Sequence, residues 1–363
     1  MLIYVLKRLA LIVPTLFGIL LLNFVIVQAA PGGPVERALA KLQGVPAAGQ
    51  GPGGGFAGAT ADITASTGNR NYKGAHGVPP DLVKRIEKLY GFDKPAPERF
   101  WLLVKHYLSF DFGMSYYRDK PVSTLILERL PVSISLGLWS TLIVYLIAIP
   151  LGIRKAVRDG SAFDVWTSTA IIVGYAIPSF LIAIILVVLF AGGSYLEWFP
   201  LRGLVSDNFA QLSMWGKVCD YAHHVFLPTV SIVVGSFAAL TMLTKNSFMD
   251  EIGKQYVQTA RAKGLSENRV LYGHVFRNAM LIIIAGFPAA FVSVFFTGVL
   301  LIEYIFSLDG LGLLSFESVI NRDYPVVFGT LFIFTLLSML LRLISDLMYM
   351  WVDPRIDFER RSR

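Results

Sequence analysis

The chain has 363 residues, of which 55% are hydrophobic and only 16% are charged, and its mean hydropathy is +0.60. This composition excludes an ordinary soluble domain. The single cysteine, Cys219, excludes a disulfide within the chain and a cysteine-based metal cluster. The net charge of +7 also occurs in nucleic-acid-binding proteins. Most lysines and arginines, however, lie beside apolar segments, so we expect membrane lipid and no nucleic acid as partners.

Six apolar segments are long enough to cross a bilayer as helices. A helix of about 20 apolar residues crosses roughly 30 Å of hydrocarbon. Helices also satisfy their own backbone hydrogen bonds in lipid. The segments lie near residues 9–30, 131–153, 165–190, 226–244, 280–303 and 325–350. The sequence therefore predicts an all-α membrane protein with six transmembrane helices.

The first segment resembles a signal peptide in one respect, because Lys7 and Arg8 precede the apolar run. The run is longer than a typical signal sequence, and Pro31 directly after Ala30 disfavours cleavage there. We therefore expect residues 1–30 to be a retained N-terminus and first transmembrane helix.

The long connection 31–130 has two parts. Residues 44–77 contain ten glycines and almost no large apolar side chains, which predicts a flexible insertion. Residues 81–91 show the spacing of a short amphipathic helix with a glycine stop. A second helix is predicted by helical spacing of apolar residues over 100–108. We expect this second part to fold against the outer membrane face.

Charge predicts the orientation of the helices. The termini and the connections 154–164 and 245–279 share one side and carry fifteen lysines and arginines. The two short connections on the other side, 191–225 and 304–324, carry three. The long connection 31–130 is not counted, because long loops cross largely regardless of charge. Both termini are therefore predicted to be cytoplasmic and 31–130 periplasmic.

The cytoplasmic connection 245–279 has the pattern of two short helices. Ser247 and Asp250 have the spacing of a capping box, which predicts a helix from there to about Lys263. Gly264 suits the left-handed conformation that ends a helix. Ser266 is the predicted cap of a second helix that continues through residue 278. An ordinary amphipathic loop held at the membrane by its positive charges is the alternative.

Residues 258–264, Gln-Thr-Ala-Arg-Ala-Lys-Gly, resemble the "EAA" loop of ABC importer permeases, with Gln258 and Thr259 in place of the usual Glu and Ala. That loop docks into a groove on the ATPase subunit. The resemblance implies that the small residues in this stretch enter the groove closely. The implied ATPase-coupling residues are Gln258, Thr259, Ala260, Arg261, Ala262, Lys263, Gly264 and Leu265.

Other stretches resemble the dipeptide and oligopeptide branch of these permeases, in matching order. They are residues 90–95 and 111–115 in the long connection, and 308–312, 322–325 and 353–355 in the last third. The glycine-rich insertion and the ending 353–358 are most similar to Yej-type permeases, which are associated with uptake of oligopeptides and microcin C-like peptides. Gly33 and Arg342 depart from the family pattern.

The resemblance implies a type I ABC importer permease fold, with residues 131–363 as its transmembrane domain. It also implies a heterodimer with a second permease subunit, a periplasmic peptide-binding protein, and ABC ATPase subunits that are separate or fused. No segment fits the phosphate-binding pattern GxxxxGK[ST], since Gln255 follows Gly253 and Lys254. The chain is thus expected to have no ATP site and no cofactor, with ATP and magnesium bound by the partner ATPases.

Three charged residues at the predicted spans are candidates for the substrate path or its gating. Arg342 and Asp346 are four apart and share a helix face, so they can also form a structural pair. Glu303 ends the fifth segment and either lines the path or faces water.

A secondary transporter or channel subunit is the alternative class. It requires more ionisable residues near mid-membrane than this chain offers. An intramembrane protease requires a Ser–His pair or paired carboxylates, and no histidine lies in a predicted span. The neighbours His223 and His224 are expected to be interfacial rather than metal ligands.

Overall fold

The computed structural model describes residues 2–29, 94–192, 195–296 and 300–352. Two compact units are present. Unit 1 comprises Met1–Leu9, Leu125–Phe316 and Phe334–Arg363, and unit 2 comprises Ala10–Thr124 and Glu317–Ile333. The glycine-rich insertion and the helix predicted over 81–91 lie outside the described residues.

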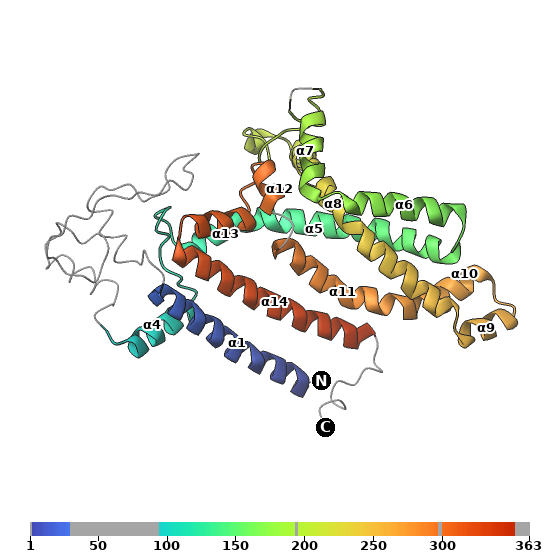
Figure 1. Cartoon of the computed structure of the whole chain (residues 1–363), viewed down its shortest axis with the longest axis horizontal. Coiled ribbons are helices and arrows are strands. Elements are labelled where there is room, and N and C mark those ends of the chain that lie inside the picture. The colour runs from blue at the N-terminus through green and yellow to red at the C-terminus, as the bar shows by residue number, and fades with distance from the viewer. Residues whose placement is uncertain (1, 30–93, 193–194, 297–299, 353–363) are drawn as a thin grey trace. The chain divides into compact units, whose positions relative to one another are not determined.

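Helices dominate the described chain (Figure 1). They are α1 (Leu2–Ala29), α4 (Ala96–Leu108), α5 (Val122–Val157), α6 (Ala162–Ala176), α7 (Ser179–Phe190), α8 (Met214–Ile252), α9 (Gln255–Ala262), α10 (Glu267–Val270), α11 (Phe276–Phe296), α12 (Leu300–Ile305), α13 (Leu311–Ile320) and α14 (Tyr324–Val352). A 3-10 turn (Phe209–Gln211) and a π-helical turn (Leu271–Val275) interrupt them. Within the described ranges there is no β-strand, so the all-α prediction is confirmed.

Five of the described helices are long and apolar enough to cross a membrane, and α6 with α7 makes a sixth if the bent pair is one span. The observed helices extend beyond the predicted apolar segments. Helix α5 has 36 residues and α8 has 39, whereas the predicted segments 131–153 and 226–244 are shorter. Hydropathy detects only the part of a helix that matches the bilayer, and the helices continue past it.

The third predicted segment, 165–190, is not one continuous helix. Helices α6 and α7 meet at 90°. The break falls at Ile177, which is extended at φ −88° and ψ 120°, directly before Pro178. A proline disfavours helical conformation in the residue before it, because its ring crowds that residue's backbone. The fifth predicted segment falls in α11 and α12, and residues 297–299 between them lie outside the described residues.

Unit 2 confirms the predicted helix over 100–108, which is α4. Phe100, Val104 and Tyr107 are buried, as the helical spacing predicted. The ring of Phe100 meets that of Phe17 from α1 edge-on, with centroids 5.2 Å apart.

Two of the family-like stretches meet at Asp323 in unit 2. The Ser115 hydroxyl donates a hydrogen bond of 2.6 Å to Asp323 Oδ2, and the backbone N–H of Tyr116 donates one of 3.0 Å to Oδ1. Asp323 is only 2% exposed, so these donors replace water around its carboxylate. The contact joins residues 111–115 to 322–325 although more than 200 residues separate them.

Candidate coupling site

The predicted glycine turn is confirmed, but the helix before it begins later than expected. Gly264 has φ +77°, the left-handed conformation that the sequence predicted. Helix α9 starts at Gln255 rather than near Ser247, which lies inside α8. The Ser247 hydroxyl donates a hydrogen bond of 2.7 Å to the Ala279 carbonyl of α11 and does not cap a helix. An acceptor on a neighbouring helix therefore replaces the predicted capping role.

The second short helix is also different from the prediction. Ser266 occupies the cap position of α10, but its side chain makes no capping hydrogen bond. Helix α10 continues through the π-helical turn Leu271–Val275 directly into α11. The glycine turn therefore connects α9 to the start of a membrane-crossing helix rather than to a separate surface helix.

One face of α9 is anchored in the chain's own core. Val257 is fully buried and Ala260 is 7% exposed. Both belong to a buried hydrophobic cluster that includes Phe248 of α8 and Ile283 of α11. Leu265, directly after the glycine turn, packs against the same cluster. Helix α9 is therefore closely packed against α8 and α11.

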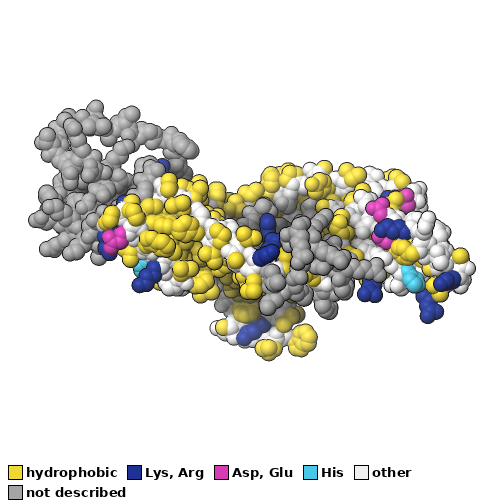
Figure 2. Space-filling view, turned by 90° about the horizontal axis from the view of Figure 1, so that it is seen from below, with side chains coloured by type: hydrophobic (Ala, Val, Ile, Leu, Met, Phe, Trp, Pro, Cys, Tyr) yellow, Lys and Arg dark blue, Asp and Glu magenta, His cyan; other side chains and the backbone are white. Residues whose placement is uncertain are grey.

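The expectation that Ala260 enters a groove on a partner is wrong, because Ala260 faces its own chain. The opposite side of α9 and the turn is open. Its exposed residues are Gln258, Thr259, Ala262, Lys263 and Gly264, while Arg261 is half-buried. Figure 2 shows lysine and arginine side chains over α9 and α10 at the right of the view, with hydrophobic side chains over much of the remaining face.

Polar contacts fasten both ends of α9. The Tyr256 hydroxyl donates a hydrogen bond of 2.6 Å to Glu251 Oε2 and accepts one of 3.2 Å from Asn278 Nδ2. Partial burial, and then the bond to Glu251, raise the pKa of Tyr256 above its usual value. Arg261 bridges the glycine turn to Glu267 with two hydrogen bonds of 3.0 and 3.1 Å. Helix α9, the turn and α10 thus form one closed element.

A buried charge cluster near this site carried no recognisable sequence signal. Lys155 of α5 is fully buried, and its Nζ lies 2.8 Å from Asp164 Oδ1 of α6. Lys245 of α8 lies 2.7 Å from Asp164 Oδ2 and 2.7 Å from Asp159 Oδ1. The cluster ties three helices together close to α9. In the sequence, Lys155 and Lys245 indicated only which side of the membrane is cytoplasmic, and nothing local indicated that they pair with Asp164.

Glu303 contradicts both readings of the sequence, because it faces neither water nor an open path. It is 1% exposed on α12. Its carboxylate accepts hydrogen bonds from Ser133 Oγ at 3.1 Å and from the backbone N–H of Leu313 at 2.7 Å. A Cβ at Gly310 would lie 2.1 Å from Glu303 Oε1, so the adjoining turn closes directly over the carboxylate. Glu303 therefore fixes the connection to α13.

Arg342 and Asp346 do not form the expected pair. Asp346 Oδ2 instead lies 3.0 Å from the Arg8 guanidinium and accepts a hydrogen bond of 2.9 Å from the Tyr4 hydroxyl. Arg342 is exposed. Four-residue spacing placed the two side chains on one face, but it gave no information about the competing donors on α1.

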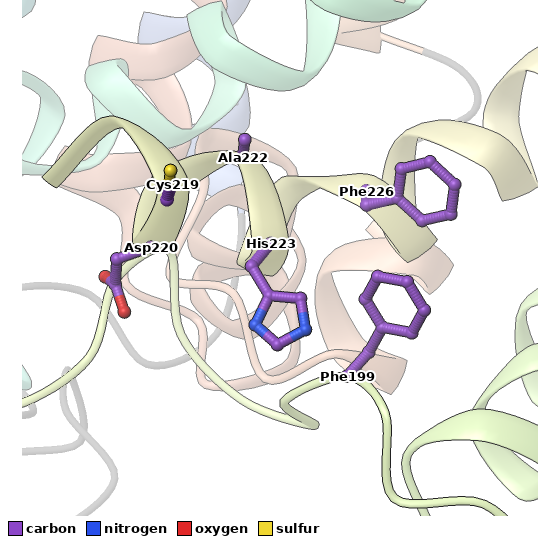
Figure 3. Close-up of a pocket in the computed structure, with 6 residues that line it drawn as sticks. All are labelled: Phe199, Cys219, Asp220, Ala222, His223 and Phe226. Atoms are coloured by element: carbon purple, nitrogen blue, oxygen red, sulfur yellow. The ribbon is translucent and has the colours of Figure 1, made fainter. Parts of the chain in front are cut away.

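His223 lines an open pocket of about 650 Å³ next to α8 (Figure 3). Phe199 and Phe226 form its aromatic wall, with stacked rings 5.0 Å apart. A ring nitrogen of His223 lies 2.5 Å from the Trp198 carbonyl. Among the described residues, no group of three or more His, Cys, Asp or Glu side chains has the arrangement of a metal site.

These features define a class: a polytopic α-helical membrane protein with an exposed helix–glycine–helix element rigidly joined to its membrane helices. Residues 148–358 match the family described as "Binding-protein-dependent transport system inner membrane component". The chain belongs to this family, as the sequence motifs predicted. It is therefore a multi-pass inner-membrane permease of the ABC importer type.

Similar proteins cover the whole length of the chain. It is 60% identical to the "Peptidoglycan transport system permease protein YejB" of Agrobacterium fabrum, over 99% of both chains. Identity to the "Inner membrane ABC transporter permease protein YejB" of Escherichia coli O157:H7 is 58%, again over 99% of both. Identity to the "Oligopeptide transport system permease protein AppB" of Bacillus subtilis is 33%, over 98% of this chain and 99% of the relative.

Proposed function

We propose that this chain is the permease subunit of an ATP-driven peptide importer, and that α9 with its glycine turn receives the ATPase. The exposed side of α9, anchored from behind by Val257 and Ala260, is the observation that carries the proposal. The same burial that stabilises α9 also attaches its exposed side to α8 and α11. A surface that transmits force requires this rigid attachment.

The mechanism follows from where energy enters. ATP and magnesium bind partner ATPases, which are separate or fused, and this chain supplies no ATP site. ATP binding closes the ATPases and displaces α9, and the shared core carries that displacement into α8 and α11. The permease is then a two-state element whose equilibrium the ATPase shifts, since ligands move such equilibria only through differential contacts.

The assembly contains a second permease subunit, paired with this one as a heterodimer, and a periplasmic binding protein that delivers peptide. Both termini are cytoplasmic in this arrangement. Reporter fusions after residues 60 and 262 test the orientation. A periplasmic signal at the first and a cytoplasmic signal at the second are expected, and the same signal at both would exclude it.

The names of the relatives guide the choice of substrate. The Bacillus relative is named for oligopeptides and the Agrobacterium relative for peptidoglycan. We infer that this importer takes up oligopeptides, including microcin C-like peptides, and that peptide-bearing cell-wall fragments are a related substrate class. All of these contain a peptide segment.

Uptake by the complete complex tests the function. The complex is reconstituted into proteoliposomes with ATP inside and the binding protein outside. Only complexes whose ATPase side faces the lumen can then take up peptide. We expect accumulation of an oligopeptide or a peptidoglycan-derived muropeptide that requires ATP and persists when ionophores remove the proton and sodium gradients. Uptake that follows the ion gradient and ignores ATP would indicate a secondary transporter and refute the proposal.

A further inference from the structure

The break between α6 and α7 borders a cavity of about 280 Å³ that none of the features above explains. Figure 1 shows α7 turned sharply away from α6 at this point. The cavity is lined by Tyr175 on α6, by Ile177 and Ser179 at the break, and by Gly235 and Ser236 on α8. All of these residues lie in unit 1.

The break leaves backbone carbonyls without partners. The last carbonyls of a helix have no acceptor role within the helix. Among the described residues, no backbone hydrogen bond outside the helices reaches the carbonyl oxygens of residues 174–176. Ile177, where the helix ends, also continues in an extended conformation rather than in a capping turn.

The location makes these free carbonyls costly. The break lies midway along the apolar segment 165–190, and Tyr175 is 63% exposed. Irregular backbone at membrane depth is tolerated only where protein covers it or where it lines a water-filled cavity. The break must therefore face either an aqueous path or another protein rather than lipid.

Hydroxyl groups gather at the same place. Tyr175, Ser179 and Ser236 each present a hydroxyl, and none of them makes a side-chain hydrogen bond to another described residue. Helix α8 packs against the break here, since a Cβ on Gly235 would be in van der Waals contact with the Ser179 Cβ at 3.4 Å. No charged side chain lines the cavity. The lining thus offers acceptor oxygens beside apolar surface from Ile177 and Ile232.

We propose that this cavity is a contact site for the backbone of the translocated peptide, which binds through its amide and terminal amino groups. Free carbonyls at a helix C-terminus carry partial negative charge and accept from N–H donors. In secondary transporters, broken membrane helices expose such carbonyls at the central substrate and ion sites, where the carbonyls coordinate cations. Recognition through the backbone suits peptides of different sequence, because the N–H groups are common to all of them. The inference rests on the proposed function.

Conservative variants of the hydroxyls test the site in the complete complex. We expect Tyr175→Phe, Ser179→Ala and Ser236→Ala each to raise the apparent KM for a hexa-alanine peptide by about two- to tenfold, the range for losing one hydrogen bond. Maximal ATPase activity and assembly should stay at parental values. Thr169→Val is the matched control, because the Thr169 hydroxyl on the same helix already donates to the Val165 carbonyl.

Photocrosslinking supplies an independent readout. A benzoylphenylalanine at position 175 should capture biotin-tagged hexa-alanine during transport, whereas one at the exposed position 166 on the same helix should not. Capture of the partner permease or of lipid instead, or a parental KM in all three single variants, would overturn the site assignment. Absence of peptide uptake by the parental complex would instead refute the proposed function itself.

Discussion

Replacing Gly264 by valine perturbs the proposed coupling element at one backbone torsion. The residue has φ +77°, and an added Cβ would meet no atom within 4 Å. The added Cβ therefore meets open space, and the cost that the structure identifies is the backbone torsion. A residue with a Cβ pays about 1–2 kcal/mol in the left-handed region, and β-branching adds to this cost.

The ion pair across the turn is too weak to hold it against that strain. The Arg261–Glu267 pair spans it, but the Glu267 side chain is 74% exposed. Exposed ion pairs contribute about 0–1 kcal/mol. We therefore expect the turn in Gly264→Val to relax toward negative φ and to change the angle between α9 and α10.

Gly264→Asn is the matched control, because asparagine tolerates left-handed torsions. The assay is copurification of the ATPase subunits, followed by the ratio of ATP hydrolysed to peptide taken up in proteoliposomes. Valine should weaken ATPase retention or raise this ratio, and asparagine should stay near the parent. Equal behaviour of valine and parent, or equal damage by both variants, would refute the torsional argument.

Two further predictions follow from burial and a third from loop length. Ala260→Trp should overpack the chain's own core and cost about 1–3 kcal/mol of stability. Ala262→Trp should leave the melting temperature of the purified chain unchanged, but the ATPase subunit should no longer copurify with it. Lys155→Met should lower the free energy of unfolding by about 3–5 kcal/mol, because the buried Asp164 carboxylate loses one of its positive partners. Arg154→Met, at the exposed neighbouring position, is the control and should leave the thermal melting temperature unchanged. Deleting 46–74 should leave assembly intact, measured by copurification of the complex, since loop closure depends weakly on length. Loss of the complex after this deletion would contradict the prediction that 46–74 is a dispensable insertion.

The sequence predicted features that depend on local chemistry. Apolar length located the membrane-crossing helices, because each crosses the bilayer on its own composition. The torsion at Gly264 was predictable for the same reason, since few residue types adopt positive φ. The break at Pro178 was visible in principle, but averaging hydropathy over a window conceals a local backbone restriction.

Features that depend on neighbours far along the chain were not predictable. Alanine is small enough for either face of α9, so only tertiary packing decides that Ala260 is buried and Ala262 exposed. Asp346 had a suitable partner four residues away, yet the structure pairs it with Arg8. Glu303 ended an apolar segment, and nothing local indicated that the turn at Gly310 would close over it.

The exposed side of α9 as the ATPase contact is the central claim, and a cysteine cross-link tests it most directly. Cys219 is exposed and is first replaced by serine. A cysteine introduced at Ala262 should then cross-link to the ATPase subunit in complexes that take up peptide, while one at the exposed Tyr195 should not. Failure of position 262 to capture the ATPase in a complex competent for uptake, or equal capture from position 195, would contradict the account.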